Sequence, residues 1–389
     1  MQEKRYFANE RCDRFFQSGL RIKKYEIKKF LSSTLNNITE SKGRVKMIKD
    51  REISIVIQGP IYKDITSCVC KRMRDIFPEA EIIVSTWEGS DTSGLIYDIL
   101  LENKDPGGTP LMLDGGLNNK TNNVDRMILS SKNGIKKASR KYTLRWRTDC
   151  LLKNDKFLSF FDKYDKRCDE WKIFKKRVLV HYPTLPYVYP LGPTDISCFG
   201  LTEDILIYWD LPLQSKDDAT YFISHQYPDD LLINIQKVAP KRGAEVYIWY
   251  NVLKKFEDKY WKIPSRFGFD FNYDILKLSE LSIANNLHVL SREDFDFQPL
   301  AHPYLLSQTK DSIFPDLWLY YYKKYCISNI PFYDLKYYIY YPIKLLLYKF
   351  KYIIPLKKML KNIQRFHFIK AIKYYRIYKK LFYFKENIE

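Results

Sequence analysis

Short, continuous runs of apolar residues alternate with amphipathic stretches over the first part of the chain. ISIVIQGP (53–60) is a β-branched run that stops at a Gly-Pro pair, and AEIIVSTWEGSD (80–91) is a second run that ends in a polar loop. YDILLENKDPGG (97–108) is a third, followed by a glycine-rich turn. Continuous apolar runs of this length are typical of strands buried on both faces, as in a parallel sheet. The pattern therefore predicts three buried strands.

Two stretches with helical character separate these strands from each other and from a fourth strand. Residues 63–77 follow the first strand, and residues 122–139 place apolar side chains at near-helical spacing after an asparagine start. KYTLRWRTDCLL (141–152) then alternates apolar or aromatic residues with polar ones, which is the period of a strand. The order strand, helix, strand, strand, helix, strand predicts an α/β fold with a mostly parallel sheet flanked by helices.

Polar residues follow each predicted strand. They occupy residues 58–60, 85–91, 105–108 and 147–149. In open α/β sheets, ligands bind outside the carboxyl ends of the strands, so we expect these four segments to form one site. Neither G-x-G-x-x-G nor G-x-x-x-x-G-K-[ST] occurs in the chain, which argues against a dinucleotide site or a P-loop.

The strand predicted to begin at residue 141 carries the most distinctive polar residues. Arg145 and Arg147 share one strand face at a spacing of two, where they could hold phosphate oxygens through charge-assisted hydrogen bonds. Asp149 follows the strand end, a suitable place for a carboxylate that binds Mg²⁺ or Mn²⁺ on a diphosphate. The alternative is structural: Asp149 caps a turn and pairs with a neighbouring arginine.

Three further polar residues are candidates for donor binding. Asp91 could accept hydrogen bonds from a base or a ribose, although an exposed loop acid has the same pattern. Asn123 and Arg126 lie near the start of the helix predicted over 122–139, where backbone amides favour an anion. The alternative is a helix cap beside a surface arginine.

Three acidic residues are candidates for a general base. Asp195 and Asp204 lie in PLGPTDISCFGLTEDI (190–205), which we expect to be a loop, and Glu245 lies in the first turn of a helix expected over 242–256. Activation of a sugar hydroxyl requires a carboxylate or histidine within hydrogen-bond distance. Each acid has a structural alternative as a surface or capping residue.

The charge of the chain points to anionic partners. The chain has 389 residues, of which 46% are hydrophobic, and a formal net charge of +19. The composition is that of a globular protein, and the charge suits phosphorylated ligands, anionic lipid headgroups or nucleic acid. Residues 336–389 contain 14 Lys and Arg against 2 acids, so 12 of the 19 net charges lie there.

The cysteines and the chain start favour the cytoplasm. Seven cysteines are scattered without zinc-ligand spacing, and the five histidines show no paired metal spacing. An odd, unpatterned set of cysteines favours a reducing compartment. MQEKRYFANERCDRFF lacks the apolar segment of a secretory signal, and no run of about 18 apolar residues predicts a transmembrane helix.

The last part of the chain has its own character. Leu356, Leu360, Ile363 and Phe366 recur at roughly helical steps among lysines and arginines, which predicts an amphipathic helix on an anionic membrane surface. The alternative is a helical face packed on its own domain. Nucleic-acid binding ranks below both, because no RNP, KH or zinc motif accompanies the basic residues.

These differences in hydrophobic pattern and charge divide the chain into three parts. A helical lead-in covers residues 1–50, the α/β domain covers 51–300, and the basic, aromatic region covers 301–389.

Several stretches together resemble the WavE-type lipopolysaccharide synthesis family over residues 53–260. They are IVIQGP (55–60), FPEAEIIVSTWEGSD (77–91), DPGG (105–108), NNVDRMILSSKNGIKKASRKYTLRWRTD (122–149), TDISCFGLTEDI (194–205) and AEVYIW (244–249). The resemblance implies a glycosyltransferase with a GT-A-like nucleotide-sugar fold.

The resemblance also assigns residues to the donor site. It places Gln58, Gly59 and Asp91 near the nucleotide, and Asn123 and Arg126 on the donor side. It places Arg147 and Asp149 where GT-A enzymes carry a metal-binding D-x-D motif, with Arg147 in place of its first aspartate. Either Asp149 alone holds Mn²⁺ or Mg²⁺, or the arginines neutralise the diphosphate without a metal.

The sequence therefore predicts a glycosyltransferase that uses a nucleotide-sugar donor. Its acceptor would be a lipopolysaccharide core or another lipid-linked or lipid-A-anchored saccharide, reached from the inner face of the cytoplasmic membrane by a peripheral protein. Two alternatives remain open. One is a sugar-phosphate transferase of capsule-type polysaccharide synthesis, and the other is a non-catalytic protein that binds a membrane surface or nucleic acid.

Overall fold

The computed structural model describes residues 48–113, 121–181, 191–226, 238–256, 273–302 and 315–327. The chain divides into two compact units, Met1–Lys46 and Met47–Glu389, and all described residues belong to the second. Most of the predicted lead-in over 1–50 and most of the basic region over 301–389 lie outside the described residues, so the structure does not test them.

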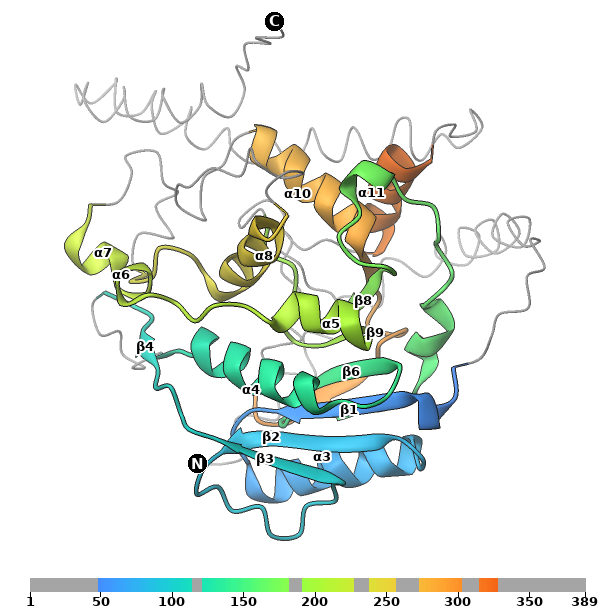
Figure 1. Ribbon diagram of the computed structural model, residues 1–389, viewed down its shortest axis with the longest axis vertical. Coiled ribbons are helices and arrows are strands. Elements are labelled where there is room, and N and C mark those ends of the chain that lie inside the picture. The colour runs from blue at the N-terminus through green and yellow to red at the C-terminus, as the bar shows by residue number, and fades with distance from the viewer. Residues whose placement is uncertain are drawn as a thin grey trace, which may run out of the picture. The chain divides into compact units, whose positions relative to one another are not determined.

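The centre of the second unit is a seven-stranded sheet (Figure 1). Its strand order is β10 (Leu287–Leu290), β8 (Val178–His181), β9 (Cys198–Leu201), β6 (Tyr142–Arg147), β1 (Ile53–Gln58), β2 (Glu81–Trp87) and β3 (Ile99–Asn103). Within this sheet β9 is antiparallel to both of its neighbours, and the other neighbouring pairs are parallel. The mostly parallel sheet predicted from the sequence is thus confirmed.

Helices cover both faces of this sheet, which explains why β1 is buried along its whole length. Helix α3 (Lys63–Ile76) lies on one face and α4 (Val124–Lys137) on the other (Figure 1). Ile55 of β1 belongs to the same hydrophobic cluster as Met73 of α3, whereas Val56 clusters with Ile128 of α4. Because successive side chains of a strand point to opposite faces, each face of β1 needs its own helix.

Further helices extend the core on the α4 side of the sheet. They are α5 (Thr202–Trp209), α8 (Ala244–Lys254), α10 (Tyr273–Asn286) and α11 (Pro315–Cys326). Trp209, Trp249 and Trp318 are buried there in one cluster. Among the helices that the structure describes, none has the length and hydrophobicity needed to cross a bilayer.

The remaining elements are short. They are β4 (Thr109–Pro110), β5 (Thr121–Asn122), β7 (Cys150–Leu152), β11 (Phe297–Pro299), α6 (Lys216–Ala219), α7 (Tyr221–Ser224) and the 3₁₀ turns η3 (Asp50–Glu52), η4 (Lys156–Phe160) and η5 (Asp169–Trp171). Strands β7 and β11 form a separate antiparallel pair, as do β4 and β5.

One prediction of local structure needs correction. The segment 190–205, expected to be a loop, contains β9 and the start of α5, because its apolar residues fill the gap between β8 and β6. In the stretch 141–152, the predicted strand is β6, which ends before Asp149 as expected, and the short apolar end after it is β7 in a different sheet. The chain leaves the main sheet at Thr148 and Asp149, which therefore lie at its edge.

Gly134 sets how closely α4 approaches the sheet. A Cβ at this position would overlap Val56 Cγ1 and lie 3.2 Å from Ser85 Cβ. We predict that Gly134→Ala lowers the free energy of unfolding by about 1–3 kcal/mol, because overpacking outweighs the gain in helix propensity. Urea unfolding measures the change, with Lys137→Ala at an exposed position of the same helix as control. Equal stability of Gly134→Ala and the native chain would contradict the prediction.

Candidate functional site

A cavity of about 780 Å³ opens beside the carboxyl ends of β1 and β6. This volume is within the range of small-molecule sites, and the position is where parallel sheets bind ligands. The cavity is lined by most of the residues that the sequence singles out: Gln58, Gly59, Asn123, Arg126, Arg147, Asp149, Asp195 and Glu245.

The floor of the cavity is the turn that ends β1. Gly59 has φ +126°, a conformation that favours glycine, and a Cβ there would lie 3.0 Å from Thr148 Oγ1. Its N–H donates to the Ser85 carbonyl (3.1 Å), and the Thr148 N–H donates to the Gln58 carbonyl (3.2 Å). The Gln58 side chain is held by Ser130, whose hydroxyl donates to its Oε1 (2.7 Å). These bonds align the ends of the central strands.

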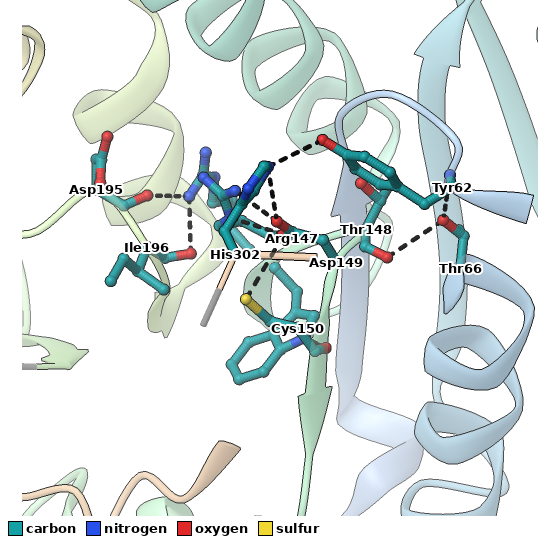
Figure 2. A network of polar contacts seen from close by, with 11 residues as sticks. Tyr62, Thr66, Arg147, Thr148, Asp149, Cys150, Asp195, Ile196 and His302 are labelled. Carbon is teal, nitrogen blue, oxygen red and sulfur yellow. Dashed lines mark hydrogen bonds and ion pairs between the residues drawn. The ribbon is translucent and has the colours of Figure 1, made fainter. Parts of the chain in front are cut away.

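Arg147 and Asp149 form a bidentate ion pair on the cavity wall (Figure 2). Arg147 Nε donates to Asp149 Oδ1 (2.8 Å), and Nη2 donates to Oδ2 (2.7 Å). Burial alone would raise the pKa of Asp149, but the hydrogen bonds and charge of Arg147, with a smaller effect of His302, hold it below its ordinary value. Burial likewise opposes the charge of Arg147, and Asp149 outweighs it and raises the arginine pKa. Both partners are therefore charged at neutral pH.

Tyr62 and His302 complete this wall, and the sequence analysis missed both. Tyr62 Oη lies 3.2 Å from His302 Nε2, which lies 3.8 Å from Asp149 Oδ2 (Figure 2). Their rings meet edge to face, with centroids 6.0 Å apart. His302 follows β11, which pairs with β7, so only a prediction of that pairing would have brought it beside Asp149.

Arg145 does not reach the cavity, contrary to the expected phosphate contact. It is fully buried, and Nε donates to Ser131 Oγ (3.0 Å). Nη1 donates to the carbonyl oxygens of Asp195 and Ile196, the latter at 3.0 Å, and the guanidinium carbon lies 4.1 Å from the Trp209 ring centroid. Arg145 and Arg147 are two residues apart on β6, but only Arg147 is at the strand end, where α5 and its neighbours no longer cover it.

Asp195 and Glu245 place two carboxyl groups on the same cavity. Both residues are partly exposed, and Glu245 is in the first turn of α8. Burial, and then the negative charge of Asp195, raise the pKa of Glu245 to about 7. A carboxylic acid poised near neutral pH beside a second carboxyl group is suited to proton transfer.

Two predicted site residues lie away from the cavity. Asp204 is fully buried, and its carboxylate accepts hydrogen bonds from the backbone N–H groups of Lys175 (2.7 Å) and Lys176 (2.9 Å). This matches the capping alternative, because no acceptor hydroxyl can reach a carboxylate enclosed in this way. Asp91 accepts hydrogen bonds from the N–H and hydroxyl of Ser93 in an exposed loop, and it is not among the residues that line the cavity.

A second ion pair lies on the cavity wall at the start of α4. Arg126 Nε and Nη2 donate to the two carboxylate oxygens of Asp105, both at 2.7 Å, and Nη1 donates to Asn123 Oδ1 (2.8 Å). Asp105 lies in the turn 105–108, one of the segments predicted to form the site, and its Oδ1 also accepts from the Gly107 N–H (2.9 Å). The missed signal is that this turn faces an arginine on the next helix.

The residues present do not fit a divalent cation at Asp149. Both carboxylate oxygens of Asp149 already accept from Arg147, so the guanidinium stands where the cation would bind. Mg²⁺ and Mn²⁺ prefer several oxygen ligands, and His302 is the neighbouring side chain that could add a nitrogen. Within the described ranges, no three His, Cys, Asp or Glu side chains are grouped to hold a metal ion.

Three solved structures share low similarity with the chain. An active-site mutant of LgtC is 11% identical, with 72% of this chain and 84% of that chain covered and a TM-score of 0.30. S. aureus TarS (1–349) is 12% identical, with coverages of 86% and 93% and a TM-score of 0.29. The galactosyltransferase LgtC with donor and acceptor sugar analogues is 12% identical, with coverages of 72% and 84% and a TM-score of 0.26. At these values no residue correspondence is drawn.

The comparison with protein-family models is informative, unlike the comparison with solved structures. A search of curated proteins finds no significant match. A family model described as WavE lipopolysaccharide synthesis matches residues 53–351, from the first strand of the sheet to beyond α11. This confirms the resemblance seen in the sequence and extends it past residue 260. The chain belongs to the WavE lipopolysaccharide synthesis family.

Proposed function

We propose that this protein is a glycosyltransferase that binds a nucleotide-sugar donor in the cavity at the ends of β1 and β6, on a GT-A-like fold. The observation that carries the proposal is the arrangement of charge in that cavity. Arg147 supplies a guanidinium at the carboxyl end of β6, and Asp195 and Glu245 supply two carboxyl groups. An inverting transfer of a sugar from a diphosphate uses these two kinds of group, a cation for the leaving group and a base for the acceptor.

Arg147 is the proposed partner of the donor diphosphate. A guanidinium has five N–H donors, and two of them are donated to Asp149. The others remain for phosphate oxygens, while Asp149 holds the planar group in one orientation. In this proposal a side-chain cation neutralises the diphosphate, which is the metal-free alternative that the sequence left open, because the carboxylate that would bind the metal already accepts from Arg147.

The carboxyl pair is the proposed acid–base group. In an inverting transfer, the acceptor oxygen forms a bond to the anomeric carbon as the bond to the diphosphate oxygen breaks. The acceptor hydroxyl proton passes to a carboxyl group of the cavity wall, which we assign to Asp195, because Glu245 retains a proton up to about pH 7. In a retaining transfer no base assignment follows.

The proposed acceptor is the lipopolysaccharide core or another lipid-linked saccharide. The support is membership of the lipopolysaccharide synthesis family. The excess of basic residues in 336–389 supports attachment to the anionic inner face of the cytoplasmic membrane. These residues lie outside the described ranges, and their support for the proposal is their charge in the sequence.

Nucleotide binding tests the donor site. We expect at least one nucleoside diphosphate or nucleotide sugar to raise the unfolding temperature in the presence of EDTA. Arg147→Gln should lower the affinity for that nucleotide at least about tenfold, because a charged hydrogen bond contributes roughly 1.5–3 kcal/mol.

The matched control is Arg74→Gln, which breaks the ion pair between Arg74 of α3 and Asp98 and leaves the cavity lining unchanged. Failure of every nucleotide to bind, with or without Mn²⁺, would contradict the glycosyltransferase proposal. Binding that requires Mn²⁺ and survives Arg147→Gln would contradict the role of Arg147.

Asp195→Asn tests the assignment of the base. The amide cannot accept a proton, so turnover should fall by about 100-fold or more, while the affinity for the donor nucleotide stays within about threefold. Turnover is followed as nucleoside diphosphate released from the donor that the binding screen identifies. Asp204→Asn, outside the cavity, should lower stability instead of nucleotide affinity. Unchanged turnover of Asp195→Asn would exclude this base.

The raised pKa of Glu245 predicts a pH dependence of stability. The folded protein keeps the proton of the Glu245 carboxyl group up to about pH 7, whereas the unfolded chain releases it near the ordinary pKa of glutamate. The contribution of Glu245 to the free energy of unfolding is therefore fully present at low pH and lost as pH rises through about 7. Between pH 4 and pH 8, the free energy of unfolding of the native chain should therefore fall by roughly 1–3 kcal/mol relative to that of Glu245→Gln. Urea unfolding across this range measures the difference, with Glu79→Gln at an exposed position as control. A difference in stability between the native chain and Glu245→Gln that does not change with pH would contradict this prediction.

A further inference from the structure

Gln58 is an enclosed polar side chain on the floor of the cavity. It is only 4% exposed, and it is one of the residues that line the cavity. The Ser130 hydroxyl donates to its Oε1 atom (2.7 Å). Within the described ranges, no atom accepts a hydrogen bond from its Nε2 atom, and Nε2 is not fully covered by protein. The amide therefore presents its two N–H donors to the cavity.

A chain of hydrogen bonds, buried over most of its length, fixes this orientation from behind. Asn133 Nδ2 donates to Asn103 Oδ1 (2.8 Å), and Asn103 Nδ2 donates to Ser85 Oγ (3.0 Å). Ser85 Oγ donates to the Ser130 carbonyl (2.8 Å), and the Ser130 hydroxyl donates to Gln58. A satisfied network of this kind rigidifies the side chain at its end. Because every member donates towards the cavity, the acceptor atom of Gln58 is occupied and its donors are left for a ligand.

The strand register places this amide beside Arg147. Gln58 of β1 is paired with Arg147 of β6 in the parallel register, and paired residues of neighbouring strands point to the same face of a sheet. That face is the one covered by α4, which carries Ser130. Since neighbouring strands lie about 4.8 Å apart, one ligand with several oxygen atoms can accept hydrogen bonds from both side chains.

The kinds of donor on this floor select the ligand chemistry. A guanidinium has only donors, and the amide of Gln58 has only its donors left. Phosphoryl oxygens are ligand atoms that only accept, and they form the strongest hydrogen bonds with donors of this kind. A sugar hydroxyl or the edge of a nucleobase carries donors of its own, which would find no acceptor on Gln58.

We propose that Gln58 is a second binding residue for a diphosphate, and that it donates its amide N–H groups to phosphoryl oxygens beside Arg147. Ser130 acts through Gln58 as a positioning residue. A neutral donor adds hydrogen bonds to the diphosphate and leaves the charge of the cavity unchanged. That the diphosphate belongs to a nucleotide sugar rests on the proposed function, whereas binding of a diphosphate by Gln58 does not.

The side-chain amide of Gln58 reports on this contact directly. Inorganic pyrophosphate is titrated into the full-length protein labelled with ¹⁵N in its glutamine side chains, and the Gln58 resonances are identified by their loss in Gln58→Met. Donation to phosphoryl oxygens should move at least one of its amide proton resonances downfield. Resonances of Gln58 that stay in place at saturating pyrophosphate would overturn the proposal.

The affinity for pyrophosphate tests the same contact by substitution. Gln58→Met, of similar length but without donors, should lower this affinity about tenfold, and Gln58→Glu, which adds a negative charge, about 100-fold or more. The matched control is Gln298→Glu, the same change at an exposed position outside the cavity lining, which should alter the affinity less than about twofold. Equal affinity of Gln58→Met and the native chain would contradict the assignment, and this comparison decides even where Gln58→Glu does not fold.

Ser130→Ala tests the positioning role. It should lower the affinity for pyrophosphate about threefold in the native chain and have no further effect in Gln58→Met, because Ser130 acts through Gln58. Equal losses in both backgrounds would exclude this role of Ser130.

The use of pyrophosphate separates this proposal from the proposed function. If pyrophosphate binds with the expected dependence on Gln58 and no nucleotide binds, the glycosyltransferase proposal fails and the role of Gln58 stands. If a nucleotide binds and pyrophosphate does not, Gln58 is not a diphosphate ligand. The same conclusion follows if Gln58→Met weakens the binding of a nucleoside as strongly as that of pyrophosphate.

Discussion

The pairing of β1 with β6 is the constraint on which the site depends. The two strands are parallel and in register from Ile53 opposite Tyr142 to Gln58 opposite Arg147, so both end at the same edge of the sheet. Gly59 and Thr148 then cross-link the strand ends through a backbone hydrogen bond and a contact that leaves no room for a side chain on Gly59. A shift of one residue in this register would turn Arg147 to the other face of the sheet, and the cavity wall would be lost.

The parts of the fold that could be predicted are those in which the local sequence pattern is compatible with one type of secondary-structure element. The β-branched run 53–58 and the amphipathic helix 124–137 match their predicted positions to within a few residues. The rule that ligands bind at the carboxyl ends of parallel strands is then enough to place Gln58, Arg147 and Asp149 at one site. Such predictions need only the period of the apolar residues and the parallel order of the strands.

The rest of the site depends on contacts between distant parts of the chain. His302 comes beside Asp149 through the β7–β11 pair, and these three-residue strands carry no pattern of their own. Arg145 has the same local pattern as Arg147, yet it is buried because α5, from about 60 residues later in the chain, covers its face with Trp209. Asp204 and Asp195 likewise differ only in what surrounds them. A sequence lists the polar side chains, but burial decides which of them face solvent or ligand.

The balance of charge in the cavity bears on how the proposed reaction would be catalysed. Arg147 is neutralised by Asp149 and Arg126 by Asp105, so the cavity has no strong excess of positive charge before a ligand enters. Because Asp149 is buried and its pKa is held low, it stays ionised. In the proposed reaction, its ion pair with Arg147 therefore remains when the diphosphate binds. The guanidinium then binds the ground state only moderately and interacts more strongly as negative charge builds up on the departing diphosphate. An interaction that grows along the reaction coordinate is the kind that accelerates the chemical step, and a cation attached to the chain provides it without a separate binding equilibrium for a metal ion.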